Sequence, residues 1–342
     1  MVLFHLNADT HVYTLTRNAW VSVDFFFVLS GFVLMSGFGT RVDDGAAFAR
    51  YSLRRLTRLY PLHLVALTVL VALIGLEAWQ TGKSLFADQH GLGALLQCLV
   101  LVQGFTTQAL SWNFPSWSVS IELWASLGFG LALWLARSKA WIVFVVVTIL
   151  LFAVWLAFGE PDGPAVTDRS ALLKAAHYLL SFISGVILFL GFAWASRGGW
   201  RPPTWAEWPA LAVVATIFVF ADKLNSPETI ALFAVVIFVF AFERGRISAW
   251  LRGRFFQALG RWSYSIYLIH PLWTIATLKL VAVAGVWIGQ RAIINDASGE
   301  LVVLGGPIVM DLTAIACLAL VIATAALTYR FIERPGMKVG KS

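Results

Sequence analysis

The sequence predicts an all-α membrane protein, a bundle of helices that crosses a lipid bilayer many times. Hydrophobic residues make up 59% of the chain and charged residues only 13%, whereas soluble domains are about 45–50% apolar and about 25% charged. The apolar residues fall in runs long enough to cross a bilayer, which takes roughly 20 residues in a helix. We therefore expect a multi-pass protein of the cell (inner) membrane, with residues 1–342 forming a single membrane-embedded domain.

Nine spans are expected from the apolar runs, at 19–38, 61–79, 117–136, 140–158, 174–194, 208–222, 227–242, 259–286 and 308–329. Residues 1–6 are expected to be the outer end of a further span that begins before Met1. The apolar stretch 92–110 is interpreted as a re-entrant or interfacial segment on the outer face, because a crossing there would invert every later basic loop. Irregular backbone persists in a membrane only where protein or a watery cavity covers it. This stretch is therefore a candidate wall of a site.

The formal net charge of +7 comes from Lys and Arg residues in short loops between the spans. Such loops are typically cytoplasmic, so we expect 39–60, 195–207, 243–258 and the tail after 329 inside the cell. The acidic loop 159–173 is expected outside. The basic charge thus indicates contact with membrane lipids, and no nucleic-acid partner is expected. Cys98 and Cys317 lie in apolar segments and have no metal-ligand spacing, so no metal is expected.

Polar groups inside a membrane are costly and are therefore candidates for function. His5 lies at the outer end of the first apolar stretch, and Asp24 lies about one turn inside the next span. A carboxylate on one ring nitrogen of a histidine fixes its tautomer and stabilises the imidazolium. The alternative is that Asp24 caps a helix and His5 is an interfacial residue. Spacing alone favours that alternative, since the two residues belong to different spans.

Glu122 follows Pro115, a residue that suits a helix start. Ser118 and Glu122 are four residues apart, so they share one helix face near the outer surface. A catalytic carboxylate and a helix cap with an interfacial Trp117 are equally compatible with this pattern.

Two further polar groups lie within predicted spans. Ser30 precedes Gly31 in the middle of its span, which favours close packing between helices over a nucleophilic serine. His270 precedes Pro271. It is either a second polar group of the site or a structural partner at the proline kink.

A cluster of arginines precedes Tyr60-Pro61. Arg50, Arg54 and Arg58 recur at every fourth position, with Arg55 beside them. Arginine forks match phosphate oxygens well. Positive-inside anchoring or contact with anionic lipid head groups is the alternative, but four arginines exceed what orientation needs.

Together these motifs resemble the membrane acyltransferase 3 family, which includes O-antigen acetylases and nodulation-factor acyltransferases. The resemblance covers the whole chain, in order. Its motifs are Val-Asp-Phe-Phe-Phe-Val-Leu-Ser-Gly-Phe at 23–32, Arg-Arg-Leu-Thr-Arg-Leu-Tyr-Pro at 54–61, Pro-Ser-Trp-Ser-Val-Ser-Ile-Glu at 115–122, Leu-Gly-Arg-Trp-Ser-Tyr-Ser-Ile-Tyr-Leu-Ile-His-Pro at 259–271 and Phe-Ile-Glu-Arg-Pro at 331–335.

The resemblance implies a bundle of about ten membrane helices, which is the expected count once one span is restored. It also implies transfer of an acyl group, expected to be acetyl, from cytoplasmic acyl-CoA to a hydroxyl of a cell-surface or lipid-linked carbohydrate. The family's first span carries an Arg and then a His about three turns later. Val2-Leu3-Phe4-His5 matches the His end, and the Arg would lie before Met1. Ser22 stands at a position where the family usually has Gly.

The roles implied for the residues follow the motifs. His5 would be the base, supported by Asp24 or Glu122. The acyl-CoA-binding residues would be Arg54, Arg55, Arg58 and Tyr60, and the substrate or supporting residues Ser30, Trp117, Ser118 and His270. Acyl-CoA (acetyl-CoA) would be a donor substrate, with no tightly bound cofactor.

Two other functions remain compatible with the sequence. A transporter or flippase of lipid-linked sugars would predict inverted repeats and broken helices in matched halves, and neither is visible. An inactive, truncated relative that binds a partner is favoured if the first span is missing.

Overall fold

The computed structural model describes residues 1–11, 16–86, 90–106, 111–159, 168–221, 224, 226–296 and 299–340. In chain order the elements are α1 (Val2–Leu6), α3 (Ser22–Phe38), α4 (Gly45–Thr81), α5 (Leu92–Leu99), α6 (Ser116–Ala136), α7 (Ala140–Phe158), α8 (Asp168–Arg197), α9 (Glu207–Phe220), α10 (Ser226–Phe240), α11 (Arg246–Leu251), α12 (Arg254–Trp287), β1 (Ile293–Asp296), β2 (Gly299–Val302), α13 (Pro307–Thr328) and α14 (Arg334–Val339). The two strands form one short antiparallel hairpin, which the sequence did not predict. Everything else that is regular is helical.

Six helical stretches of the described residues are long and apolar enough to cross a membrane. They are Ala19–Phe38, Gly45–Thr81, Ser116–Phe158, Ser170–Arg197, Arg254–Trp287 and Pro307–Val339. The predicted class is confirmed, but the predicted count of nine spans is not. The stretch Ser116–Phe158 contains both α6 and α7, joined by a 3-10 turn at Arg137–Lys139. Helices α9 and α10 have 14 and 15 residues, or about 21–23 Å, which is less than the roughly 30 Å of a hydrocarbon core.

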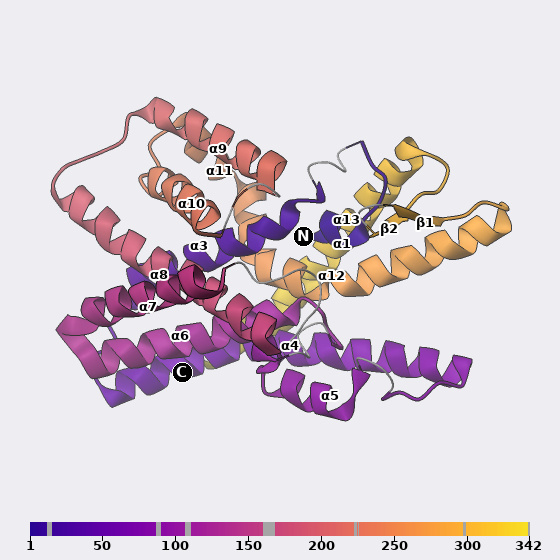
Figure 1. Ribbon diagram of the computed structural model, residues 1–342, viewed down its shortest axis with the longest axis horizontal. Helices are drawn as coiled ribbons and strands as arrows, with labels where there is room; N and C mark the ends of the chain where they lie inside the picture. Colours follow the sequence, from indigo (N-terminus) through magenta and orange to yellow (C-terminus); the bar gives the residue numbers. More distant parts are fainter. Residues whose placement is uncertain are drawn as a thin grey trace.

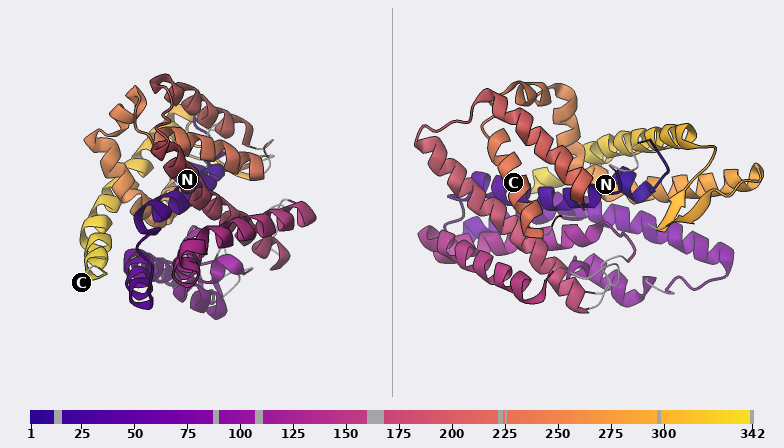
Figure 2. Two further views of the ribbon diagram at one scale, coloured as in Figure 1. Left: turned by 90° about the vertical axis from the view of Figure 1, so that its left-hand side faces the viewer. Right: turned by 45° about the horizontal axis from the view of Figure 1, so that its top comes forward.

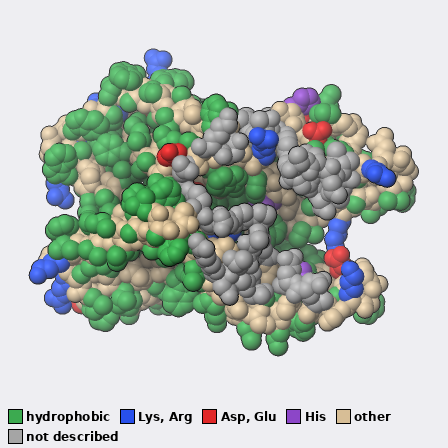
Figure 3. Space-filling model, viewed as in Figure 1, with side chains coloured by type: hydrophobic (Ala, Val, Ile, Leu, Met, Phe, Trp, Pro, Cys, Tyr) green, Lys and Arg blue, Asp and Glu red, His purple; other side chains and the backbone are tan. Residues whose placement is uncertain are grey.

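The long helices run roughly along the longest axis of the molecule (Figure 1). The α6–α7 turn, the α8–α9 loop and the C-terminus lie toward one end, on the left, and the β-hairpin between α12 and α13 lies toward the other. Lys and Arg side chains lie toward both ends of the face in Figure 3, and hydrophobic side chains cover much of the surface between them. The cytoplasmic position of the basic loops remains a prediction. Residues 160–167 of the predicted outer loop lie outside the described residues.

Helix α3 passes through the interior of the bundle (Figure 2) and packs most extensively against α8. The contact depends on two glycines, because a Cβ on Gly31 would lie 1.9 Å from the Phe182 carbonyl oxygen and one on Gly185 would lie 1.9 Å from that of Val28. Only residues without a side chain allow two helix backbones to approach so closely. The predicted close packing at Ser30-Gly31 is thus confirmed.

Residues 92–106 form no crossing helix. Helix α5 has eight residues, or about 12 Å, and is followed by Leu101 with a φ of 54° and a 3-10 turn at Gln103–Phe105. The buried Gln103 amide donates to the Ser116 carbonyl over 3.1 Å, which docks this segment on the start of α6. Re-entry into a membrane remains a prediction, and 107–110 lie outside the described residues.

Candidate functional site

A cavity of about 280 Å³ lies between α3, α4, α6 and α12. Apolar side chains of α3, among them Phe26 and Phe27, form much of one wall. Five of the predicted site residues line the cavity: Ser30, Arg55, Arg58, Ser118 and Glu122. Ser118 and Glu122 therefore share one face of α6, as their spacing predicts. Within the described part of the chain, no group of three or more His, Cys, Asp or Glu residues could hold a metal ion.

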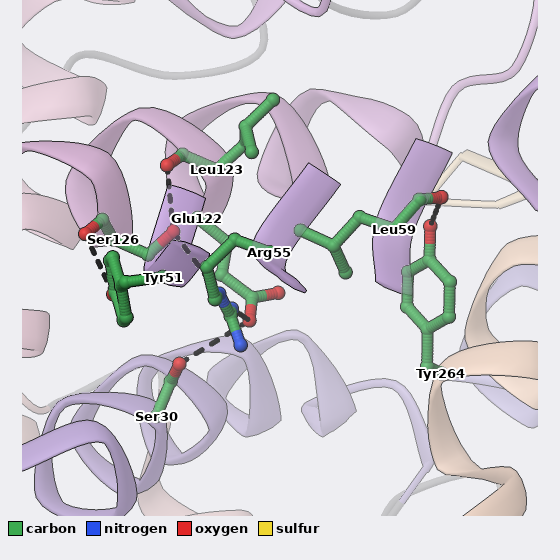
Figure 4. Close-up of polar contacts among 8 residues, drawn as sticks. All are labelled: Ser30, Tyr51, Arg55, Leu59, Glu122, Leu123, Ser126 and Tyr264. Atoms are coloured by element: carbon green, nitrogen blue, oxygen red, sulfur yellow. Dashed lines mark hydrogen bonds and ion pairs between the residues drawn. The ribbon is translucent and has the colours of Figure 1, made fainter. Parts of the chain in front are cut away.

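An ion pair crosses the cavity wall from α4 to α6 (Figure 4). Nη2 of Arg55 lies 2.9 Å from Oε1 of Glu122, and the Ser30 hydroxyl donates to the same oxygen over 3.3 Å. The Arg55 side chain is 6% exposed and that of Glu122 is 29% exposed. Charges withdrawn from water require such partners, because an unpaired buried charge is strongly destabilising. The pair holds a negative charge inside an apolar cavity.

The Arg55 side chain is held from a second direction. Its Nε donates to the Ser126 hydroxyl over 3.3 Å, and the Tyr51 hydroxyl donates to the Ser126 carbonyl over 2.8 Å. Further along, the Tyr264 hydroxyl donates to the Leu59 carbonyl over 2.5 Å, which ties α12 to α4 (Figure 4). The Arg55 guanidinium is therefore held by Ser126 through Nε and by Glu122 through Nη2.

The predicted acyl-CoA-binding residues separate into two groups. Arg58 is exposed and lines the cavity, and it has no hydrogen bond or ion pair within the described part of the chain. Arg54 instead donates from Nε to the Gly340 carbonyl over 3.2 Å, and the Tyr60 hydroxyl donates to the Leu99 carbonyl. The helical period alone does not separate these residues, because Arg54 and Arg58 are four residues apart and lie close together around α4. The C-terminal segment that ends at Gly340 engages Arg54 and leaves Arg58 at the cavity.

Two hydroxyl groups meet on the cavity surface. The Ser118 hydroxyl lies 2.7 Å from that of Tyr267, a residue of α12. Both lie near the Pro115 carbonyl oxygen, at 3.2 Å from Ser118 and 3.0 Å from Tyr267. The sequence analysis did not single out Tyr267. Its position three residues before His270, in the motif 259–271, is the signal that could have found it.

His5 and His270 lie face to face. Their ring centroids are 5.2 Å apart with an interplanar angle of 20°, and the Phe114 ring lies 4.6 Å from that of His5. His270 is fully buried. The structure thus brings together two histidines from opposite ends of the chain.

The proline after His270 determines which of its nitrogens carries the proton. Pro271 has no N–H, so the Tyr267 carbonyl, four residues earlier, loses its usual helical donor. His270 Nδ1 lies 2.6 Å from this oxygen. A carbonyl can only accept, so Nδ1 carries the hydrogen. In the neutral ring Nε2 then has the lone pair, and it has no hydrogen-bond partner among the described residues.

The structure does not bring His5 and Asp24 together, which corrects the expectation that Asp24 supports this histidine. Asp24 Oδ1 lies 2.6 Å from Nε2 of His177 and accepts from the Ser181 hydroxyl over 3.0 Å. Asp24 and Gly31 are seven residues apart, so they lie on the same face of α3, the face that meets α8. That packing buries Asp24 against α8 and away from His5.

Two other predicted residues have structural neighbours of their own. Glu122 is engaged by Arg55 and Ser30 rather than by His5. The Trp117 ring packs against Tyr178 at 4.9 Å and does not line the cavity. Asp24's partners on α8 were missed because no local sequence pattern connects them.

These features define a membrane helix bundle with a largely apolar cavity that contains an ion pair and two hydroxyl groups. The acyltransferase domain family matches residues 3–329. The chain belongs to this family, the membrane acyltransferase 3 family that its motifs resemble, and it is an acyltransferase.

The chain is similar to two curated proteins, the first of which is named an acyltransferase. The chain is 26% identical over 273 residues to acyltransferase MdmB of Streptomyces mycarofaciens, covering 73% of this chain and 67% of the relative. It is 33% identical over 73 residues to protein 2 in the picA locus of Rhizobium radiobacter, covering 21% of this chain and 38% of that protein. No solved structure matches the chain.

Proposed function

We propose that this protein transfers an acyl group, expected to be acetyl, from cytoplasmic acyl-CoA to a hydroxyl of a cell-surface or lipid-linked carbohydrate, in the inner membrane. The observation that carries the proposal is the cavity that joins Arg58 to the Ser118–Tyr267 hydroxyl pair between four helices. The acyl-bearing arm of acyl-CoA needs a passage of this kind, which leads from a charged group that can bind the CoA phosphates to a reaction centre within the bundle.

The donor would bind through its phosphates at the end of the cavity that bears Arg58. This guanidinium is exposed and unengaged, and arginine forks suit phosphate oxygens. Arg55 would contribute less directly, because two of its five N–H donors are already engaged by Ser126 and Glu122. Arg54 and Tyr60 would hold α4 against neighbouring segments, through the Gly340 and Leu99 carbonyls, and would not contact the donor.

The acceptor hydroxyl would lose its proton at the histidine pair. We assign the role of base to His5, with His270 stacked against it. Glu122 would support the centre electrostatically through its pair with Arg55. Asp24 would act from a distance, by holding α3 against α8 through His177.

The experiment is acyl transfer from labelled acetyl-CoA to lipid-linked glycan in membranes that contain the protein. We expect label in a base-labile ester on the glycan, and its loss in the Arg58→Gln and His5→Gln variants. Membranes with the inserted protein but without ester formation would contradict the proposal. Movement of unmodified lipid-linked sugar across the membrane would then support a transporter.

A further inference from the structure

The hydroxyls of Tyr267 and Ser118 take part in more hydrogen-bond contacts than their two hydrogens can supply. Three short contacts connect these two hydroxyls and the Pro115 carbonyl oxygen, yet two hydroxyls supply only two hydrogens. The Pro115 carbonyl also accepts the backbone N–H of Ser118 over 3.3 Å, so it needs at most one of these two hydrogens. The other is then held only by the neighbouring hydroxyl, and it can turn toward a new acceptor at little cost.

We propose that this hydroxyl pair is the donor that stabilises the oxyanion of the acyl transfer, an inference that rests on the proposed function. Both residues line the cavity, so a thioester carbonyl that enters it can reach them. Donors whose oxygen atoms are already fixed near the developing charge stabilise a transition state with little reorganisation, and here only the O–H bond has to turn.

The step balances with the groups present and the two substrates. The acceptor oxygen attacks the thioester carbon and its proton passes to a histidine nitrogen. The carbonyl oxygen becomes an oxyanion that accepts the hydrogen bond from Tyr267 or Ser118. When the carbonyl reforms, the C–S bond breaks, and the CoA sulfur takes the proton back from the histidine. The products are an ester and free CoA.

The position of the pair relative to the histidines suits this step. Tyr267 contributes its hydroxyl to the pair and its backbone carbonyl to Nδ1 of His270. Phe114, which packs against His5, immediately precedes the Pro115 carbonyl that the hydroxyls share. The turn that contains Phe114 and Pro115, just before α6, thus contacts both the proposed base, His5, and the hydroxyl pair. Glu122, one turn beyond Ser118, is paired with Arg55, which reduces its repulsion of a nearby oxyanion.

The test compares Tyr267→Phe, Ser118→Ala and the double variant. Each single variant removes one hydroxyl of the pair, and with it the contact that holds the other hydroxyl in place. We therefore expect each single variant to lower kcat by about 10²–10³-fold with a KM for acetyl-CoA within about threefold of wild type. The double variant should be little worse than either single variant.

Ser120→Ala is the matched control. Its hydroxyl also lies on α6, but it donates to the Leu101 carbonyl over 2.6 Å, away from the cavity. We expect this variant to lose folding stability and to keep kcat within about twofold. Values of kcat within about threefold of wild type in both Tyr267→Phe and Ser118→Ala would overturn the proposal.

A binding measurement separates this proposal from the proposed function. The trifluoromethyl ketone analogue of acetyl-CoA hydrates to a tetrahedral species that resembles the intermediate, and the thioether analogue does not. Loss of either hydroxyl should weaken binding of the ketone at least about tenfold and leave the thioether unaffected. Equal effects on both analogues would contradict the oxyanion role. If the wild-type protein binds the ketone tightly but transfers no acyl group to the glycan, the proposed function is wrong. The change in ketone affinity relative to thioether affinity in the variants still tests the oxyanion role.

Discussion

The guanidinium of Arg55 lies 2.9 Å from the carboxylate of Glu122, and this contact joins two sequence motifs that lie 67 residues apart. It fixes α4 against α6 at the cavity. It also gives each of these two charges a partner of opposite sign, although Arg55 is buried and Glu122 is partly buried.

The first prediction concerns this pair. Arg55→Gln or Glu122→Gln should lower the free energy of unfolding by about 1.5–3 kcal/mol, since each leaves a charged partner with weaker hydrogen bonds. The partial exposure of Glu122 keeps the cost below that of a fully buried pair. The double variant should recover part of the loss, as measured by denaturant titration in mixed micelles. Strictly additive losses would show that the two groups are not coupled.

The second prediction ranks the arginines. Arg58→Gln should weaken acyl-CoA binding by about 1.5–3 kcal/mol with little change in stability, because its exposed side chain makes no hydrogen bond or close ion pair in the described part of the protein. Arg54→Gln should have a smaller effect, because Arg54 contacts the Gly340 carbonyl and does not line the cavity. Binding of labelled acyl-CoA to purified protein measures both. Equal losses in the two variants would point to a general electrostatic role.

The third prediction concerns the α3–α8 contact. Gly31→Ala and Gly185→Ala should each destabilise the protein by about 1–3 kcal/mol, because the new methyl group would overlap a backbone carbonyl of the other helix. The matched controls are Gly37→Ala in α3 and Gly191→Ala in α8, where nothing lies within 4 Å of the added atom. The controls should be neutral or slightly stabilising. Thermal unfolding in detergent measures all four, and a loss in the controls equal to that at Gly31 would refute the packing argument.

The fourth prediction tests the base. General-base catalysis contributes about 10²–10⁴-fold in rate, so His5→Gln should lose most acyl transfer and retain acyl-CoA binding. His11→Gln is the control. His11 bonds Asp311 through an exposed ring, so it should keep transfer even if the loop at 7–11 loosens. Full activity of His5→Gln would transfer the role of base to His270.

The proline beside His270 offers a fifth prediction. Pro271→Ala restores an N–H that competes for the Tyr267 carbonyl, so His270 Nδ1 would lose its acceptor. We expect a slower reaction and a changed pH profile of kcat, with little change in acyl-CoA affinity. A rate and pH profile identical to those of wild type would show that the tautomer of His270 is unimportant.

Some features of the protein follow from its sequence alone. Hydropathy identifies a membrane helix bundle, because the length of an apolar run is a local property of the sequence. It does not give the number of spans, since six of the described helical stretches, and not nine, are long and apolar enough to cross. The helical period also places Ser118 and Glu122 on one face of α6. The glycine in the middle of α3 correctly indicates where another helix approaches closely.

Only the tertiary structure decided which polar groups become partners. Asp24 meets His177, 153 residues away, because the Gly31–Gly185 contact turns that face of α3 toward α8. Arg55 and Arg58, but not Arg54, reach the cavity because rotation of α4 about its axis depends on what packs around it. The stacking of His5 on His270 arises in the same way. Partner choice between distant helices depends on packing geometry, and packing is set by the whole bundle rather than by any local motif.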